Sequence, residues 1–339
     1  MCPDKPVSFS ELCDFLRIPG EIGTFRERAL DKSREAQYDE TIEFRIAKKE
    51  EKKIMKCSDI NIRDPFVVFE DGIFYMYGTR AANFGNRTGG VDVYTSEDME
   101  TWSDPIPCFD SVRFGMNRGV NWAPEVHVYK GAYYMLATFT RECGLHGTYI
   151  LRADSPLGPF VPHGDKELTP AEWECLDGTL YVSPAGTPYL VFCHEHTQIS
   201  DGTICYVELS DDLTHAVSEP VLLFRASESG WAESIPFGGG RNYVTDGPFM
   251  YRSESGEQFM IWSSFINGRY VVLPVKFADG RLGSEFEHQE PIITDDGGHG
   301  MIFRAEDRLY LTFHTPNASG SEHPCFVKIE DMGDRLVRR

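Results

Sequence analysis

Five segments of similar form follow one another after residue 59, and they constrain the fold more than any other feature of the sequence. Each has an acidic, small or histidine-bearing opening, an apolar stretch, a turn with Gly or Asp, and a second stretch rich in aromatic residues. They are centred on Asp64, Ala123, Asp177, Asp246 and His299. Each interval is long enough for four short strands, and periodic four-stranded units are typical of a propeller. We therefore predict an all-β, five-bladed β-propeller. A β-sandwich is the alternative, but it does not explain five similar units.

The charge of the chain divides it into two parts. Residues 1–58 carry 12 basic and 12 acidic side chains, so the formal net charge of -20 belongs to residues 59–339. We predict that 59–339 form the propeller and hold the catalytic site. For 1–58 we predict a short extension of mixed helix and strand that packs on the propeller or mediates an oligomer. Its role is not indicated by the sequence.

Composition excludes several classes of partner. A chain this acidic is repelled by nucleic acid and by anionic membrane surfaces. No stretch approaches the roughly 20 apolar residues that span a bilayer, and the first residues lack a basic segment followed by an apolar core.

The nine cysteines include no C-x-x-C pair, and residues such as Cys193 and Cys205 stand singly in apolar runs. We expect reduced, buried thiols and a cytoplasmic protein.

Propeller geometry brings the starts of the five units together. The first strand of each blade lies nearest the axis, so residues at the strand starts converge on one mouth of the central channel. We expect this set to be Asp64, Glu125, Asp177, Asp246 and His299. Clustered carboxylates repel one another, which raises the pKa of some and leaves others ionised, as acid–base catalysis requires. The same cluster suits cation binding, so the residues alone leave both functions open.

Seven short motifs carry a resemblance to glycoside hydrolase family 43 over residues 59 to about 330. They are RDPFV at 63–67, SEDMETW at 96–102, WAPEV at 122–126, DSPLGPF at 154–160, LDGTLYV at 176–182, VTDGPFMY at 244–251 and GGHGMIF at 297–303. Each motif is weak alone, and their order and spacing make the set specific. The resemblance implies a five-bladed propeller that hydrolyses glycosidic bonds with inversion, using three carboxylates.

The resemblance also implies a role for each carboxylate. Asp64 would be the general base and Asp177 the residue that tunes and orients the acid. Asp246 occupies the place of the general acid, where the family usually has Glu. Because Asp is one methylene shorter, Glu195 and Glu233 are the alternative acids.

Further site residues follow from the same resemblance. His299 matches an axial histidine that commonly helps to hold a hydrated Ca²⁺, and a histidine without metal is the alternative. No organic cofactor is implied. We expect Trp122, Glu125 and Glu195 to contact the substrate; Trp122 would otherwise pack between blades, and Glu125 would seal a blade junction.

The expected function is an inverting, exo-acting hydrolase that releases arabinofuranosyl or xylosyl units from small plant-derived oligosaccharides. A galactosidase-like or fructan-cleaving enzyme is one alternative, and a phosphorylase is another, although few basic residues besides Arg63 flank the repeat openings. A propeller that binds sugar without cleaving it is the third. The sequence does not distinguish these sharply, and it gives neither the sugar nor the linkage.

Overall fold

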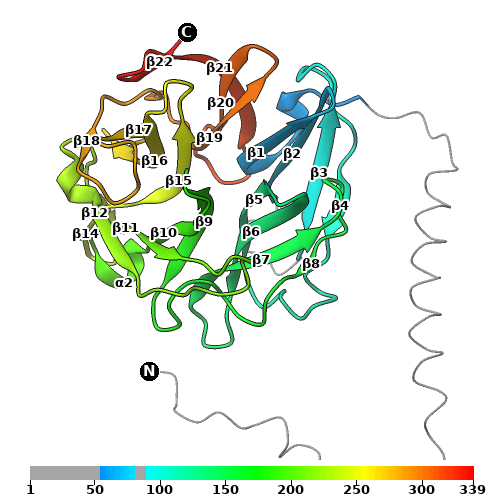
Figure 1. Ribbon diagram of the computed structural model, residues 1–339, viewed down its shortest axis with the longest axis horizontal. Coiled ribbons are helices and arrows are strands. Elements are labelled where there is room, and N and C mark those ends of the chain that lie inside the picture. The colour runs from blue at the N-terminus through cyan, green and yellow to red at the C-terminus, as the bar shows by residue number, and fades with distance from the viewer. Residues whose placement is uncertain (1–53, 81–88) are drawn as a thin grey trace, which may run out of the picture. The chain divides into compact units, whose positions relative to one another are not determined.

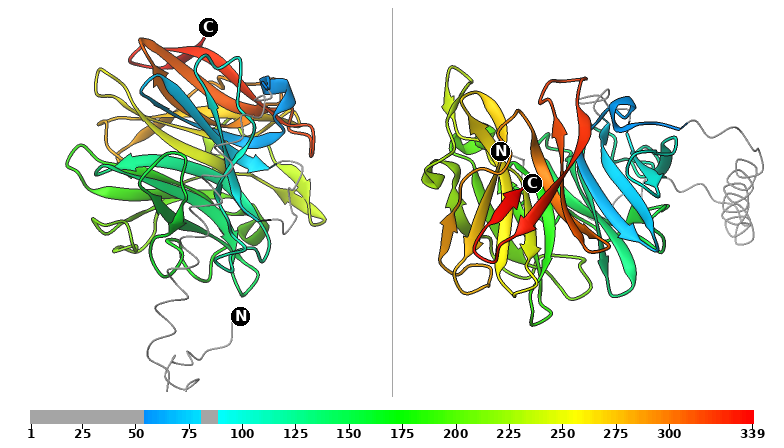
Figure 2. Two further views of the ribbon diagram at one scale, coloured as in Figure 1. Left: turned by 90° about the vertical axis from the view of Figure 1, so that its right-hand side faces the viewer. Right: turned by 90° about the horizontal axis from the view of Figure 1, so that it is seen from above.

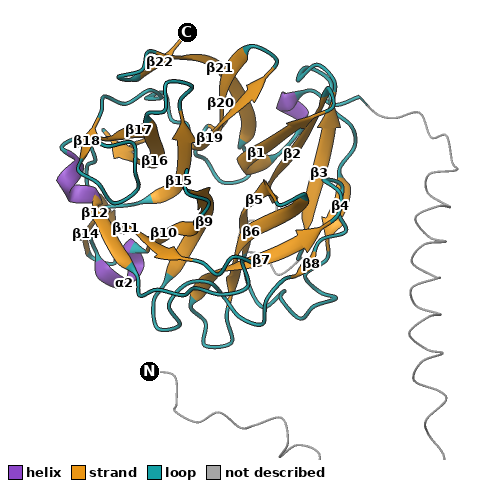
Figure 3. Cartoon of the chain, in the orientation of Figure 1, coloured by secondary structure: helices purple, strands orange, loops and turns teal. Residues whose placement is uncertain are grey.

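Five antiparallel four-stranded sheets surround a central axis in the computed structural model, which describes residues 54–80 and 89–339 (Figure 1). They belong to one compact unit, Ile54–Arg339. Strands and loops make up almost all of it (Figure 3). The predicted all-β, five-bladed propeller is confirmed. The predictions made for residues 1–53 lie outside the described residues.

Each blade is formed by strands that are consecutive in the chain. The strands are β1 (Ile62–Glu70), β2 (Ile73–Arg80), β3 (Val91–Ser96) and β4 (Ile106–Phe109) in blade 1; β5 (Asn121–Tyr129), β6 (Ala132–Thr140), β7 (His146–Ala153) and β8 (Val161–Pro162) in blade 2; β9 (Cys175–Val182), β10 (Pro188–His194), β11 (Thr203–Glu208) and β12 (Val221–Arg225) in blade 3; β15 (Asp246–Arg252), β16 (Gln258–Ile266), β17 (Arg269–Phe277) and β18 (Phe286–His288) in blade 4; and β19 (Gly298–Ala305), β20 (Arg308–Thr315), β21 (His323–Asp331) and β22 (Leu336–Arg338) in blade 5. β1, β5, β9, β15 and β19 lie innermost (Figure 1).

Short elements connect or flank the blades. A hairpin of β13 (Ile235–Phe237) and β14 (Gly240–Asn242) precedes blade 4, and helix α2 (His196–Ile199) follows β10. Two 3-10 helices, η1 (Cys57–Asp59) and η3 (Ala226–Ser229), complete the set. Among the described residues, no helix has the length and apolar character needed to cross a membrane.

Tight hairpin turns explain why neighbouring strands pair locally. The two-residue loops Asp71–Gly72, Lys130–Gly131 and Asn267–Gly268 each have positive φ at both positions. This backbone matches the right-handed twist of the strands that it joins, and Gly adopts it at little cost. These loops therefore favour antiparallel pairing of β1 with β2, of β5 with β6 and of β16 with β17.

The hydrophobic core lies between the blades. Blades 1 and 2 share a cluster with Tyr77 and Met135, blades 2 and 3 one with Leu136 and Phe192. Blades 3 and 4 meet through a further cluster, which includes the fully buried Trp262. Sheets stacked face to face bury one another's apolar surfaces, and the view from the side in Figure 2 shows this packing around the axis.

The last blade closes on the first through both apolar and polar contacts. The largest cluster joins blades 4, 5 and 1. At the mouth of the channel, the Arg63 guanidinium contacts Glu322 at 2.7 Å, and Asn61 Nδ2 donates to the Glu322 carbonyl at 2.8 Å. Glu322 is fully buried, so its charge depends on this arginine. The closure of the propeller is therefore built next to the channel mouth.

Every innermost strand carries a β-bulge near its start. The bulge residues have positive φ between 46° and 57°, and they are Asp64, Ala123, Asp177, Gly247 and His299. A bulge leaves one residue outside the ladder and turns its side chain out of the regular alternation. The five bulges occupy equivalent positions, so they form one ring around the axis.

The backbone N–H of each bulge residue needs an acceptor outside its own strand pair, and in four cases a side chain on the second strand of the preceding blade supplies it. The bonds are Ala123 N to Thr79 Oγ1 at 2.7 Å, Asp177 N to Thr138 Oγ1 at 3.0 Å, His299 N to Ser263 Oγ at 2.8 Å and Asp64 N to His314 Nδ1 at 3.1 Å. In the fifth case, Gly247 N donates to Asp177 Oδ2 at 3.1 Å. The four acceptors on second strands each pair with the residue before the bulge of their own blade. This ring of hydrogen bonds, which we call the bulge ring, ties neighbouring blades together.

Replacing Thr138 by Val should lower the free energy of unfolding by about 1–3 kcal/mol, because it leaves the buried Asp177 N–H without its acceptor. Its cross-strand partner Thr148 provides a matched control. Thr148 is also fully buried, and its hydroxyl makes no hydrogen bond within the described residues, so Thr148→Val should change stability by less than about 0.5 kcal/mol. Urea unfolding of both variants measures the difference. Equal losses would contradict a specific contribution from the bulge ring.

Candidate functional site

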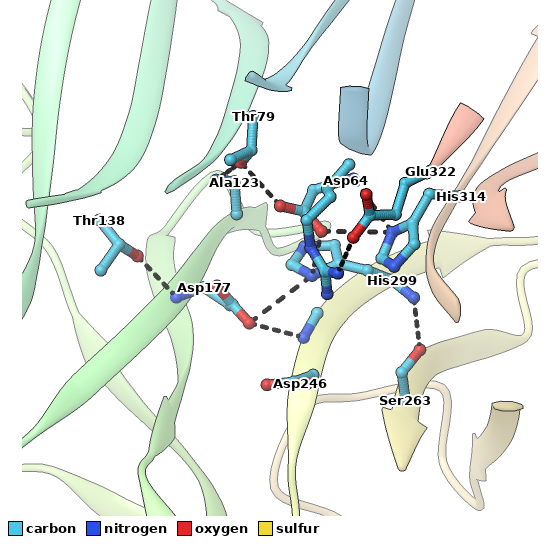
Figure 4. Close-up of polar contacts among 12 residues, drawn as sticks. Asp64, Thr79, Ala123, Thr138, Asp177, Asp246, Ser263, His299, His314 and Glu322 are labelled. Carbon is cyan, nitrogen blue, oxygen red and sulfur yellow. Dashed lines mark hydrogen bonds and ion pairs between the residues drawn. The ribbon is translucent and has the colours of Figure 1, made fainter. Parts of the chain in front are cut away.

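Three of the predicted site residues meet at the bulge ring. His299 Nδ1 lies 3.3 Å from Asp64 Oδ1 and 3.7 Å from Asp177 Oδ2. Figure 4 shows the imidazole between the two carboxylates, with Asp246 beside them on β15. All three groups come from bulges of different blades, so the propeller brings together side chains that are far apart in the sequence.

The carboxylate of Asp64 is held on several sides. Thr79 donates from Oγ1 to Asp64 Oδ2 at 2.7 Å, and the same hydroxyl accepts the Ala123 N–H. The Asp64 N–H bonds to Nδ1 of the fully buried His314. Because that nitrogen accepts, the proton of a neutral His314 lies on Nε2. Asp64 is therefore fixed in position by both neighbouring blades.

Asp64 stays ionised although it is buried. Burial alone raises its pKa, but the charges of His299, Arg63 and His314 and the contact with His314 outweigh burial and hold the pKa well below the usual range. Burial also lowers the pKa of His299 to about 4, so that this imidazole is neutral near pH 7. The permanent cation at Arg63 is then the charge that keeps Asp64 ionised at neutral pH.

Asp246, unlike Asp64, has a raised pKa. Burial, followed by the negative charge of Glu195, raises the pKa of Asp246 to about 8, against a hydrogen bond from Tyr270 and the charge of Arg63. Tyr270 donates from its hydroxyl to Asp246 Oδ2 at 2.9 Å. Asp246 stands one residue before the bulge, where its strand still pairs with Ser263. It is therefore a protonated carboxylic acid next to an ionised one.

Asp177 lies between these two groups. Its pKa is raised well above the ordinary value by burial and by the charges of Asp246 and Asp64, while the hydrogen bond from Gly247 N–H lowers it. Gly247 directly follows Asp246 in the chain, so this bond links the Asp177 carboxylate to the strand that carries Asp246. Two carboxyl groups so close share protons as a pair.

Glu195 follows β10 and precedes helix α2, with a buried side chain. Burial raises its pKa to about 7, and its charge acts on both Asp177 and Asp246. Glu195 is thus a second protonatable carboxyl at the site. The other alternative acid, Glu233, is exposed, and its carboxylate accepts the N–H of Asn267 at 2.8 Å.

Trp122 and Glu125, two of the predicted substrate contacts, lie at different positions along β5. Trp122 stands one residue before its bulge, equivalent to Asp246, and its ring centroid lies 5.2 Å from that of His146. Glu125 does not join the carboxylates of the ring, because it lies two residues beyond the Ala123 bulge. Its carboxylate is buried and lies 2.9 Å from His127 Nε2. The expected convergence therefore holds for Asp64, Asp177, Asp246 and His299, but blade 2 presents Ala123 in place of Glu125.

The predicted cation at His299 can be tested against the donors present. His299 Nε2 is buried without a hydrogen bond among the described residues, which leaves it available to a ligand. However, no group of three or more His, Cys, Asp or Glu side chains within residues 54–80 and 89–339 could hold a metal ion. Ca²⁺ takes six to eight oxygen ligands, so these side chains do not fit a protein-bound calcium. We derive no step through a cation, and the calcium site stays a prediction.

Sequence reasoning missed the acceptors of the bulge ring and the tyrosine that contacts Asp246. The missed residues are Thr79, Thr138, Ser263, His314, Tyr270 and Glu322. Four of them were detectable in principle, because Thr79, Thr138, Ser263 and His314 stand near the end of the second strand of successive repeats. All seven cysteines of the described residues are free. The expected burial holds for Cys108, Cys175, Cys193 and Cys205, whereas Cys57 and Cys325 are partly buried and Cys143 is exposed.

Asp246→Asn and Asp64→Asn should affect stability in opposite directions at alkaline pH. The unfolded pKa of Asp is about 3.9, so the folded state holds the Asp246 proton between about pH 4 and about 8 while the unfolded state has lost it. Stability from this group therefore falls as pH rises, and Asp246→Asn should melt at least about 3 °C above wild type at pH 9. Asp64 has a lowered pKa and contributes stability above about pH 4, so Asp64→Asn should melt below wild type. Thermal unfolding at pH 5 and pH 9 checks both signs; the same sign for both variants would contradict the assignment.

Comparison with known proteins agrees with this arrangement. Residues 58–328 match the family described as Glycosyl hydrolases family 43. An arabinoxylan arabinofuranohydrolase of Bacillus subtilis (strain 168) is 29% identical over 156 residues, which are 38% of this chain and 30% of that protein's length. The chain thus spans less than a third of this curated relative.

Solved structures are similar over most of the propeller. An endo-arabinase from Bacteroides thetaiotaomicron VPI-5482 is 36% identical with a TM-score of 0.76, covering 83% of this chain and 98% of that one. A family 43 β-xylosidase/α-arabinofuranosidase from a compost microbial metagenome, solved with xylotriose in a calcium-free form, has a TM-score of 0.65 at 15% identity, covering 84% and 96%. At that identity the likeness shows the fold alone. The family match covers most of the chain, and with the shared propeller it shows that the protein belongs to glycosyl hydrolase family 43.

Proposed function

We propose that the protein hydrolyses arabinofuranosyl linkages in oligosaccharides, with inversion at the anomeric carbon. The observation that carries the proposal is the pair of carboxyl groups with opposite protonation, the buried Asp64 ionised and the partly buried Asp246 protonated. The choice of arabinofuranosyl over xylosyl units is supported by the endo-arabinase, which is 36% identical and covered almost completely, and by the arabinofuranohydrolase match.

The mechanism follows from the two protonation states. Asp246 donates its proton to the glycosidic oxygen as the bond to the anomeric carbon breaks, so the leaving sugar departs as a neutral alcohol. Asp64 accepts a proton from a water molecule, whose oxygen forms the new bond to the anomeric carbon from the opposite face. At the end Asp246 is ionised and Asp64 protonated, and proton exchange with solvent restores both. Asp177, bonded to Gly247 N–H, orients the strand of the acid.

The site also bears on the alternative functions. Asp in place of the family's usual Glu first suggested a propeller that binds sugar without cleaving it. However, Asp246 is partly buried, bonded to Tyr270 and protonated near pH 7, which are the properties a general acid needs. For a phosphorylase, phosphate would need cationic partners, and the guanidinium of Arg63 at the mouth is already paired with buried Glu322. Both observations favour hydrolysis.

Asp64→Asn should lower kcat by at least about 10³-fold, because the amide cannot accept a proton from water. Asp246→Asn should lose about 10²–10⁴-fold on arabino-oligosaccharides. It should lose much less on 4-nitrophenyl α-L-arabinofuranoside, whose leaving group needs little protonation. Steady-state kinetics with both substrates measures the contrast, and NMR of the first-formed sugar should show the inverted anomer.

Glu195→Gln provides the matched control, since it neutralises the second protonatable carboxyl of the site. It should affect the two substrates to a similar extent. If the selective loss on oligosaccharides appears with Glu195→Gln instead, Glu195 is the acid. A wild-type enzyme that cleaves xylosides but no arabinofuranosides would overturn the proposed sugar, and unchanged turnover by Asp64→Asn would overturn the mechanism.

A further inference from the structure

One position of the bulge ring differs from the other four. The acceptor positions on the second strands of blades 1 to 5 are occupied by Thr79, Thr138, Cys193, Ser263 and His314. Four carry a hydroxyl or an imidazole nitrogen that accepts the N–H of the next blade's bulge. Cys193 carries a thiol, which is a weak acceptor.

Where position 193 carries a thiol, the next bulge N–H bonds to a carboxylate of the site instead. By the pattern of the ring, the side chain at position 193 would accept the N–H of Gly247. The Gly247 N–H instead donates to Asp177 Oδ2 at 3.1 Å. Asp177 is the bulge residue of the same blade as Cys193, so the missing acceptor is replaced from within the blade by a carboxylate of the site.

Cys193 is fully buried and chemically inert in this setting. Its side chain is 0% exposed, and burial, together with the charges of Asp177 and Asp246, raises its thiol pKa well above the usual value. A neutral thiol next to two carboxyl groups adds no charge and is a weak acceptor, and its side-chain partner is Thr245. It fills the space of a hydroxyl-bearing residue without competing for the Gly247 N–H.

We propose that Cys193 is a positioning residue that reserves the Gly247 N–H for Asp177, and so fixes the Asp177 carboxylate against the strand that carries Asp246. This inference rests on the proposed function, because it assigns Asp177 a part in the reaction. A better acceptor at 193 would capture the Gly247 N–H and leave Asp177 Oδ2 without it. Groups that face Asp177 would then set its orientation; they are Asp64, Asp246, His299 and Glu195.

Cys193→Ser and Cys193→Ala separate this role from simple packing. Serine is close to cysteine in size and can accept as Ser263 does for His299 at 2.8 Å. It should therefore disturb Asp177 and lower kcat about tenfold with KM within about twofold, as expected when an interaction made in the transition state is lost. Alanine has no acceptor and should keep the Asp177 bond, so its kcat should exceed that of the serine variant. Alanine leaves a cavity, however, so its melting temperature should be the lower of the two.

Cys205→Ser is the control for a buried thiol-to-hydroxyl change in the same blade. Cys205 lies on β11 and its sulfur is 3.5 Å from the Thr203 hydroxyl, so it should keep wild-type kcat. Kinetics use an arabino-oligosaccharide, or another oligosaccharide that the wild type cleaves, because its leaving group needs protonation by the acid. If alanine loses as much kcat as serine or more, Cys193 acts only through packing and the proposal is wrong.

Crystal structures of the two Cys193 variants give a readout independent of activity. In the serine variant, Ser Oγ should lie within about 3.2 Å of Gly247 N, and Asp177 Oδ2 should have moved away. In the alanine variant the Asp177–Gly247 bond should remain. If the serine hydroxyl does not take the Gly247 N–H, the proposal fails even for an active enzyme. If the wild type cleaves no glycoside, the proposed function fails, and the two structures still decide whether position 193 controls Asp177.

Discussion

The structure depends on one requirement of the backbone, which is that a buried N–H at each bulge must find an acceptor. The bulge removes this N–H from its own ladder, and an unpaired buried donor costs about 1–3 kcal/mol. In all five cases a side chain of the preceding blade accepts this N–H, and these bonds tie neighbouring sheets together. The same bulges turn Asp64, Asp177 and His299 toward the axis. Blade packing and assembly of the site are thus consequences of one local irregularity repeated five times.

Neighbouring charges give Asp64 and Asp246 different pKa values, although both stand near the start of an innermost strand. Asp64 is buried and Asp246 partly buried, and loss of hydration alone would raise the pKa of both. Arg63 stabilises the charge on Asp64, whereas Glu195 destabilises the charge on Asp246. The Arg63 side chain is itself held by Glu322 from the last blade. An ionised and a protonated carboxyl group therefore arise from the same residue type, through the charges placed beside each one.

Sequence patterns predicted the blades and three of the carboxylates because both are encoded locally. Strand, turn and opening residues recur in each repeat, and Asp64, Asp177 and Asp246 stand within those openings. Glu125 was misplaced because its depth depends on where the bulge falls, and Ala123 takes that position in blade 2. The acceptors were missed for a different reason. Thr79 or Ser263 acts on the next blade, and no pattern within one repeat shows which partner lies across the interface. Tyr270 was also missed. It contacts Asp246 from the third strand of its blade, and the sequence pattern of a repeat does not show that contact.

The contact of Asp64 with the final blade has a consequence for biosynthesis. Asp64 lies near the beginning of the propeller, yet its N–H bonds to His314, and its neighbour Arg63 is neutralised by Glu322. A nascent chain that has left the ribosome only through blade 4 lacks both partners. Asp64 therefore gains its full set of contacts only after residues of the last blade have been synthesised. Because translation runs from the amino end, the candidate site is complete only when the circle of blades closes.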